Sequence, residues 1–567
     1  MPQSVWPARP NRWDVVAAGL VFGALALIIA VAREMHMPLE ALGAAPIVLD
    51  PVHLPAYAAR TTVRMFAALG LSLVFTFAIG ALAAKSRRAE KILIPLLDIL
   101  QSVPVLGYLS FTVLVFLSLF PGSVLGAELA AIFVIFTSQV WNMTFSFYQS
   151  LRTVPRELEE AARAFQFSPW QRFWRLEVPF AIPGLVWNMM MSMSGGWFFV
   201  VAAEAIAVGT HTIALPGIGS YVALAIAERD LAAVGAAIVA MLAVIGLYDQ
   251  LMFRPLVAWA DKFRMGETAA LEVPRSWLLT LLRRTRLVRS AGAPLRRGAH
   301  EMAMWRLDFR RFEVPFSQGT KTRVADALYY GVLAALGLAG AGFAASLVAG
   351  IGIDEVLHVL LLGLFTLLRV AVLLVIALVV WVPLGVLIGL RPRLAARLQP
   401  LAQFLAAFPA NLLFPVAVVG IVHFRLDPDI WLSPLMLLGA QWYILFNVIA
   451  GASAVPHDLV EAARGFHVRG WLWWRKVMLP AVFPYVITGA LTAWGGAWNA
   501  SIVAEAVRWG DTHLVAQGLG AYITVHTEAG DYERIALGVI VMCLFVVALN
   551  RLLWRPLYDA AARRFQV

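Results

Sequence analysis

Cysteine and charge are both scarce in this sequence. A single cysteine, Cys543, occurs among 567 residues, which excludes a disulfide framework and any cysteine-based metal cluster. Only 14% of the residues are charged and 61% are apolar, whereas a soluble domain is about 25% charged and about 45–50% apolar. This composition disfavours a water-soluble enzyme.

Several motifs that carry chemistry are also missing. No Gly-Lys dipeptide occurs, which excludes the P-loop that cradles the phosphates of a bound nucleotide. The ten histidines are scattered, without HExxH or another metal-ligand spacing. The sequence therefore predicts neither a metal site nor nucleotide hydrolysis by this chain, and no acid–base constellation indicates a membrane-bound enzyme.

Apolar segments of membrane-spanning length dominate the chain, since a helix needs about 20 residues to cross a bilayer. They form two sets of six. The first set lies near 14–32, 64–84, 104–120, 125–150, 180–203 and 232–253, and the second near 327–350, 364–390, 409–423, 431–453, 481–506 and 534–554. The sequence predicts an all-α polytopic membrane protein with twelve spans. The segments at 104–120 and 409–423 open at prolines and are short, which indicates tilted or broken helices.

Basic residues gather in alternate loops, at 85–91, 152–175, 391–397 and 464–476. By the positive-inside rule these loops and both termini face the cytoplasm. The segment 262–324, between the two sets of spans, carries fourteen Lys+Arg against five Asp+Glu and is predicted to lie on the same side. Because neither an aromatic–basic module nor a zinc spacing accompanies this charge, anionic lipid headgroups are a better partner for it than nucleic acid.

An internal repeat relates the two halves of the chain. A gap-free offset of 301 residues aligns the region 154–264 with the second half, and the offset becomes 305 upstream. The aligned pairs include Arg64 with Arg369, Trp197 with Trp498, and Glu204 with Glu505. Because both halves have six spans and begin on the same side, the repeat is parallel. The two six-span copies are predicted to surround a pseudo-two-fold axis that contains a transport pathway.

The repeat divides the chain into five segments. They are a first span with an outer loop at 1–63, the first repeat at 64–261, a basic cytoplasmic linker at 262–324, a seventh span with an outer loop at 325–363, and the second repeat at 364–567. The linker is predicted to act as a tether between the two repeats.

One cytoplasmic loop of each repeat carries the same motif, EAARAFQFSPWQRFWRLEVP at 160–179 and EAARGFHVRGWLWWRKVMLP at 461–480. Its alanines favour helix and leave a small face that another protein can approach. The prolines that end the motif fit the first turn of the following span. We therefore predict a short helix in each loop that docks on a cytoplasmic partner. The predicted docking residues are Glu160, Ala161, Ala162, Arg163 and Pro179, and Glu461, Ala462, Ala463, Arg464 and Pro480.

These two loops resemble the EAA loops in the permease subunits of bacterial ABC importers of type I. Their cytoplasmic side and the order of the surrounding spans agree with this resemblance. The segments WFFVVAAEAIAVG with LPGIGSY, and WNASIVAEAVRWG with QGLGAY, look like the nitrate, sulfonate and taurine branch, and more closely its duplicated members. The loop glycine of the family is replaced by Gln166 and His467, and its leucine by Val178 in the first copy. The geometry of the two loops and their equivalence are therefore left open.

The resemblance implies a multi-pass permease of the bacterial inner membrane that imports a small anion such as nitrate, a sulfonate or bicarbonate. Two cytoplasmic ATPase subunits would hold ATP and Mg²⁺, so that this chain itself binds no cofactor. A separate periplasmic or lipid-anchored binding protein would deliver the substrate.

The fifth span of each half supplies the candidate pathway residues. Asn188, Ser194 and Asn499 offer uncharged hydrogen bonds to an oxyanion, and Trp197 and Trp498 are either constrictions or packing residues. Glu204 and Glu505 end the span and are either gating residues or carboxylates paired with arginine or backbone. An ion-coupled secondary transporter with two six-span halves is the alternative function. It predicts intramembrane charges, of which the sequence shows almost none, and it leaves the paired loops unexplained.

Overall fold

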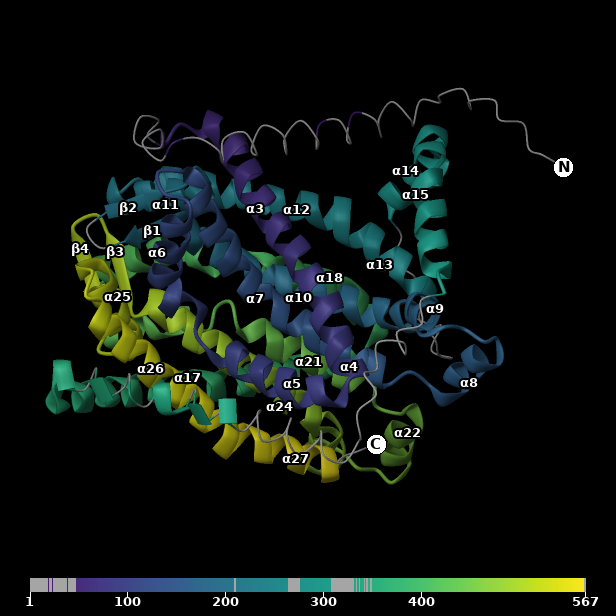
Figure 1. Ribbon diagram of the computed structural model, residues 1–567. Coiled ribbons are helices and arrows are strands. Elements are labelled where there is room, and N and C mark those ends of the chain that lie inside the picture. Colours follow the sequence, from purple (N-terminus) through teal and green to yellow (C-terminus); the bar gives the residue numbers. More distant parts are fainter. Residues whose placement is uncertain are drawn as a thin grey trace.

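The computed structural model describes residues 47–208, 211–263, 276–306 and 351–564, with scattered positions in 19–38 and 331–350. The predicted spans at 14–32 and 327–350 lie outside the described ranges. Within those ranges the regular structure is helical apart from two short β-hairpins and an isolated bridge, as Figure 1 shows. The predicted all-α fold class is thereby confirmed.

The first repeat contains three helices that π-helical turns make continuous. Turns at Thr76–Gly80, Phe173–Glu177 and Asp249–Phe253 join consecutive segments into helices of 35, 36 and 33 residues. The helices are α3 (Leu54–Phe75), α4 (Ala81–Lys85), α5 (Arg87–Ser102), α6 (Leu109–Leu119), α7 (Val124–Arg152), α8 (Arg156–Ala164), α9 (Pro169–Arg172), α10 (Val178–Glu204), α11 (Ile218–Ala227), α12 (Leu231–Tyr248) and α13 (Arg254–Ala260). Strands β1 (Ala205–Val208) and β2 (His211–Ala214) pair antiparallel after α10.

The second repeat has the same plan. Its π-helical turns at Trp474–Met478 and Asn550–Trp554 lie 301 residues after those at Phe173–Glu177 and Asp249–Phe253. The helices are α17 (Ile353–Gly389), α18 (Pro392–Ala407), α19 (Phe414–His423), α20 (Pro428–Trp431), α21 (Gln441–Ser453), α22 (His457–Gly465), α23 (Gly470–Trp473), α24 (Leu479–Ala504), α25 (Leu519–Ala529), α26 (Tyr532–Leu549) and α27 (Arg555–Arg564). Strands β3 (Ala506–Trp509) and β4 (Thr512–Val515) follow α24. Between the repeats lie α14 (Trp277–Arg284) and α15 (Arg286–Met304).

The number of spans within the described ranges is lower than the sequence predicted. Seven helices there are long and apolar enough to cross a membrane, and two bent helix pairs raise the number to nine. The short segment predicted at 104–120 is broken, as its opening proline indicated, because extended backbone at Val103 and Pro104 separates α5 from α6 and leaves α6 with 11 residues. At about 1.5 Å per residue this helix is too short for a hydrocarbon core of about 30 Å.

The two repeats interlock through their broken helices. Leu106, which follows the break in the first repeat, is buried in the apolar core of the second. Ala407 and Leu412, which flank the corresponding break in the second repeat, are buried in the core of the first. Each repeat therefore completes the core of the other, which explains how two copies form one body.

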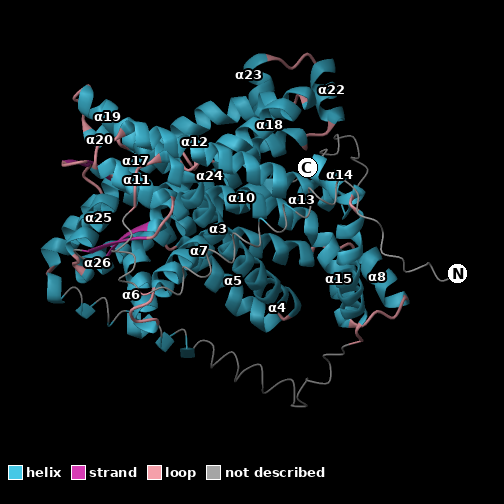
Figure 2. Cartoon of the chain, turned by 90° about the horizontal axis from the view of Figure 1, so that it is seen from above, coloured by secondary structure: helices cyan, strands magenta, loops and turns pink. Residues whose placement is uncertain are grey.

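The helical faces turned away from these cores are apolar and exposed. The exposed residues of α17 include Leu361, Leu364, Leu368, Val372, Val375 and Val379, at the three- and four-residue spacing of one helix face. A broad apolar surface of this kind is typical of contact with lipid. Figures 1 and 2 both place the β-hairpins at the left end of the molecule and α8 and α22 at the right end.

Candidate functional site: paired coupling loops, arginine clamps and a cavity between the repeats

The helices α8 and α22 form the predicted loop motifs, and we call them the coupling helices. Their buried alanines, Ala162 and Ala463, are 5% and 6% exposed and hold each helix against its own repeat. The remaining motif residues, Glu160, Ala161 and Arg163 with Glu461, Ala462 and Arg464, are exposed. Pro179 and Pro480 lie in the first turn of α10 and α24. The predicted helix in each loop is confirmed, whereas its docking role stays a prediction.

Both coupling helices end in the same left-handed turn. Gln166 has φ +53° and His467 has φ +57°, the region that favours glycine. The amide of Phe167 donates to the carbonyl of Ala162, and the amide of Gln166 to that of Arg163, which is the Schellman pattern. Residues 463–468 make the equivalent bonds. Replacement of the family's glycine therefore leaves the turn in place, although a side chain there carries strain.

Glycine at these two turns should stabilise the coupling helices. We expect Gln166→Gly and His467→Gly each to favour the folded loop by about 1 kcal/mol or less, because left-handed backbone is costly for residues with a Cβ. Slower hydrogen exchange of the helix amides would report this gain. Ala164→Gly, at a right-handed helical position, is the matched control and should speed exchange. Faster exchange in the two turn variants would contradict the assignment.

Each coupling helix is followed by an exposed phenylalanine that the sequence reasoning did not single out. Phe165 is 75% exposed and Phe466 is 84% exposed, and they occupy equivalent C-cap positions. A large aromatic side chain held in water at the same point of both repeats is suited to insertion into a pocket on a partner. The repeat alignment, which pairs the two residues, was the available signal.

A cluster of buried charges ties the first β-hairpin to the helices around it. Arg64 on α3 makes a bidentate ion pair with Glu128 on α7, at 2.6 and 2.7 Å, and a 2.7 Å bond to Glu204. Arg64 also donates to the carbonyl of Pro216, in the segment that leads into α11. The side chains of the arginine and the two glutamates are at most 6% exposed. We call this cluster the arginine clamp of the first repeat.

The N-terminus of α11 completes this clamp. The amide of Gly219 donates to Glu204 at 2.7 Å, and the amide of Ile218 donates to Thr61. A Cβ at Gly217 would collide with the Glu204 carboxylate, and one at Gly219 with the carbonyl of Val201. The glycines of the LPGIGSY segment therefore let a helix N-terminus, which favours negative charge, approach the carboxylate closely.

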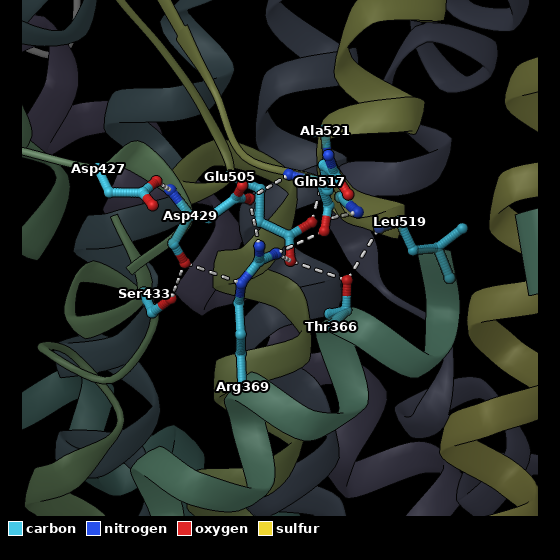
Figure 3. A network of polar contacts seen from close by, with 10 residues as sticks. Thr366, Arg369, Asp427, Asp429, Ser433, Glu505, Gln517, Leu519 and Ala521 are labelled. Atoms are coloured by element: carbon cyan, nitrogen blue, oxygen red, sulfur yellow. Dashed lines mark hydrogen bonds and ion pairs between the residues drawn. The ribbon is translucent and has the colours of Figure 1, made fainter. Parts of the chain in front are cut away.

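The second repeat has an equivalent clamp around Arg369, which Figure 3 shows. Arg369 bonds Asp429 at 2.7 Å and Glu505 at 3.2 Å, and it donates to the carbonyl of Gln517. Thr366 donates to Glu505 and accepts from the amide of Leu519. The acid that pairs with the arginine differs between the copies, since Asp429 takes the place of Glu128 and its side chain is 42% exposed whereas the first clamp is buried.

The clamps bear on the two interpretations of Glu204 and Glu505, whose roles stay a prediction. Both carboxylates are paired with arginine and backbone amides, at the hairpin end of the molecule. Neither lines the cavity described below. The geometry thus matches the structural alternative, because a buried charge requires such partners. The clamps also correct the expectation that the spans contain almost no charged residues. The charged residues of each clamp are paired with one another.

A cavity of about 80 Å³ lies where the two copies of the fifth span meet. Gly195 and Phe199 on α10 and their equivalents Gly496 and Ala500 on α24 all line it, so both repeats contribute the same positions. One water needs about 10–15 Å³ on this scale, so the cavity admits several waters or a small solute. None of its lining residues is charged. The aromatic lining residues are Phe198, Phe199, Phe408, Trp442, Tyr443 and Phe446.

The predicted pathway residues separate into two groups. Only Ser194 lines this cavity. Asn188 donates to Ser146 and to the carbonyl of Gly184 within the first repeat. Asn499 accepts from the amide of Val105 and so joins the repeats.

The tryptophans Trp197 and Trp498 are fully buried within their own repeats. Trp197 packs on Tyr248, and Trp498 stacks on Phe545 with ring centroids 6.1 Å apart. This placement favours the packing interpretation over a constriction. In the cavity, sequence reasoning missed Tyr443, whose hydroxyl lies 2.9 Å from where a Cβ on Gly195 would be. Tyr443 lies in an apolar span and replaces Asn142 of the first repeat, so only the comparison of repeats signalled it.

No group of three or more His, Cys, Asp or Glu side chains within the described ranges is placed to hold a metal ion. The coupling helices, the clamps and the cavity are therefore the features from which function is inferred.

Comparison with known proteins identifies the family. Residues 76–254 and 381–566 each match the family described as "Binding-protein-dependent transport system inner membrane component". The chain belongs to this family. The two matched segments fall within the two repeats, so the chain is a fused, duplicated member of it.

Three permeases illustrate the proteins to which this chain is similar. The chain is 31% identical over 176 residues to the bicarbonate transport system permease protein CmpB of Synechococcus elongatus, covering 31% of this chain and 60% of the relative. It is 29% identical over 184 residues to the nitrate import permease protein NrtB of Leptolyngbya laminosa, covering 32% and 62%. It is 32% identical over 187 residues to the glycine betaine/proline betaine transport system permease protein ProW of Escherichia coli, covering 33% and 49%. The chain thus spans less than two thirds of each relative.

The arginines of the clamps were the main site residues that sequence reasoning left without a role. Arg64 and Arg369 were aligned as repeat equivalents; Arg369 is a lone cation within an apolar segment, and Arg64 stands at the start of one. Such a residue requires an intramembrane partner. That requirement was a sufficient signal for a buried ion pair, but the identity of the partners, Glu128 and Asp429, depends on helix packing.

Proposed function

We propose that this chain is the permease of an ATP-driven importer, in which a small solute crosses between the two repeats. The observation that carries the proposal is the joint presence of two equivalent coupling helices and one cavity on the interface between equivalent helices. Both features are explained if the solute pathway between the repeats changes shape when ATPase subunits act on the coupling helices. Membership of a binding-protein-dependent transport family supports the same conclusion.

The partners follow from this proposal. Two cytoplasmic ATPase subunits dock on α8 and α22 and hold ATP and Mg²⁺, while this chain binds no cofactor. The coupling-helix end, the linker and both chain termini then lie in the cytoplasm of a bacterium, and the β-hairpin end faces a periplasmic or lipid-anchored binding protein. The exposed apolar helix faces contact membrane lipids.

The proposed substrate is a small anion such as bicarbonate, nitrate or a sulfonate. Support comes from the bicarbonate and nitrate permeases among the relatives. The cavity lining offers the Ser194 and Tyr443 hydroxyl groups but lacks a cationic side chain. Neutral donors suit transient passage of an anion better than tight binding, so selectivity would reside mainly in the binding protein.

A betaine is the second candidate substrate, because a specific observation favours it. The cavity lining is rich in aromatic side chains, and aromatic faces attract quaternary ammonium groups. A relative named for glycine betaine and proline betaine transport is in agreement. The aromatic lining and the absence of charge suit this class as well as they suit an anion.

Uptake assays decide between the two classes. The permease, its ATPase and its binding protein are reconstituted together, and ATP-dependent uptake of bicarbonate, nitrate and taurine is compared with that of glycine betaine. Anion uptake with no betaine uptake is the expected result. Betaine uptake alone would reject the anion and keep the importer, whereas solute uptake independent of ATP, driven by an ion gradient, would reject the importer.

Filling the cavity should block transport without unfolding the protein. Gly195→Leu places a side chain where even a Cβ lies 2.9 Å from the Tyr443 hydroxyl. We expect uptake to fall about tenfold or more, since the leucine would occupy the cavity through which the solute is proposed to pass. Gly235→Leu on α12 is the matched control, because a Cβ there meets no atom within 4 Å. Normal uptake by the Gly195 variant would place the pathway elsewhere.

A further inference from the structure

The linker does more than join the repeats, because its second helix is attached to the first coupling loop. The indole Nε1 of Trp170 donates to the carbonyl of Met302 at 2.7 Å. The side-chain amide of Gln171 donates to the carbonyl of Met304 at 2.8 Å. Both acceptors lie in the last turn of α15, where helix carbonyls are available to outside donors. The Met302 carbonyl also accepts from the amide of Trp305, the C-cap residue. The segment α9, which directly follows the coupling helix α8, thus caps α15.

Hydrogen bonds within its own loop orient the side-chain amide of Gln171 that donates to α15. Its side-chain oxygen accepts from the amide of Ser168 at 3.0 Å, and its backbone amide donates to the Ser168 hydroxyl at 3.3 Å. This capping box orients the side chain so that its nitrogen is directed outward. Gln171 is only 5% exposed, so the contact with Met304 is made in a largely water-free position.

The second repeat has no equivalent of this attachment at the same positions. Gln171 corresponds to Leu472, which has no side-chain donor, and Ser168 corresponds to Arg469, so the capping box is absent. Trp170 corresponds to Trp471, whose side chain is 72% exposed, and Leu472 is 53% exposed. The loop after α22 therefore exposes an apolar surface that includes Trp471 and Leu472. The corresponding positions after α8 are covered by α15.

The covering helix lies at the same end of the molecule as the coupling helices. Figure 1 shows α15 reaching α9, and Figure 2 shows α15 beside α8. Arg297 and His300, in the C-terminal half of α15, are exposed. The sequence of α15 contains four arginines and one glutamate, which suits an acidic surface.

We propose that the two ATPase-docking sites are built differently, an inference that rests on the function proposed above. The first site is composite, with α8 and the basic helix α15 both contacting an acidic surface of the docked ATPase subunit. The second site consists of α22 and the exposed apolar side chains of Phe466, Trp471 and Leu472, which follow that coupling helix in the chain. One polypeptide thereby offers two distinguishable positions to its ATPase pair.

Photo-crosslinking tests the composite site in the assembled transporter. The photoreactive residue p-benzoylphenylalanine is placed singly at Phe165, Phe466 or Arg297 in the full chain with its ATPase in lipid nanodiscs. All three positions are expected to crosslink to the ATPase. Gln171→Leu should lower the crosslink from position 297 about fivefold, the effect of one neutral hydrogen bond, and should leave those from 165 and 466 unchanged.

Two variants control for damage to the loop. Ser168→Ala removes the capping hydroxyl but keeps the Gln171 donor, so it should reduce the crosslink from position 297 less than Gln171→Leu does. Leu472→Gln, the reciprocal change in the second repeat, should leave all three crosslinks unchanged.

The outcomes separate the inference from the function. Crosslinks at 165 and 466 with none at 297, or with lipid as the only product at 297, would overturn the composite site and keep the importer. A crosslink at 297 that Gln171→Leu does not weaken would also overturn it. Absence of ATPase crosslinks at both 165 and 466 would instead reject the proposed function.

Discussion

Replacing Arg64 by methionine should remove most of the folded protein. The change leaves Glu128 and Glu204 buried without their cation, and breaking a buried ion pair in this way costs about 3–5 kcal/mol. The whole stability of a folded domain is only about 5–15 kcal/mol. The measurement is the yield of monodisperse protein after membrane extraction, together with its thermal unfolding in detergent.

The second clamp provides an internal comparison. Arg369→Met should cost less than Arg64→Met, because the Asp429 side chain is 42% exposed and can be hydrated when its partner is lost. Arg254→Met is the control, since its pair with Asp249 is at the surface and should contribute about 1 kcal/mol or less. Adding Glu128→Gln and Glu204→Gln to Arg64→Met should restore part of the yield by removing the stranded charges. Equal losses for Arg64→Met and Arg254→Met would show that the clamp does not hold the hairpin.

Reversing the charge on both coupling helices should uncouple transport from ATP. Glu160 and Glu461 are exposed at equivalent positions of α8 and α22, so Glu160→Arg with Glu461→Arg alters the docking surface and leaves the cores intact. A loss of about 1.4 kcal/mol at each site corresponds to about tenfold weaker docking of the ATPase. We expect the ATPase to be lost on co-purification and ATP-driven uptake to fall by a similar factor or more.

The design of this experiment includes a charge control. Glu228→Arg makes the same change at an exposed residue that follows α11 at the opposite end of the molecule. It should leave ATPase binding unchanged. The single variants should differ from one another if the first site is composite, because α15 still contacts the ATPase when α8 is altered. Normal uptake in the double variant would remove the coupling helices from the docking interface.

Local pattern was sufficient for the helical architecture of the described part of the chain. The apolar blocks located all of the spans found there, because a bilayer imposes a length and a composition that are visible in the sequence alone. The exception at 104–120 shows the limit of this reasoning. A window of apolar residues does not reveal how much helix follows the extended backbone at Val103 and Pro104, which leaves α6 with only 11 residues.

The coupling helices were likewise predictable, and so was their relation to the repeat. Helix propensity at Ala161 and Ala162 and the proline at the next span are local properties. The left-handed turn at Gln166 and His467 was not predictable, since neither residue favours it strongly and the turn is imposed by the backbone bonds that end the helix.

By itself, the sequence determined that this is a duplicated, polytopic membrane protein with a loop helix at the same position of each repeat. The repeat, the periodicity and the span length are all local properties of the chain. Only the tertiary structure decided which residues meet. Glu204 is paired with Arg64, 140 positions away, and Ser194 lies in a cavity whereas Trp197 lies in a core. The attachment of α15 to Gln171 was decided in the same way. Contacts between distant segments depend on the packing of whole helices, and a single sequence carries no direct record of that packing.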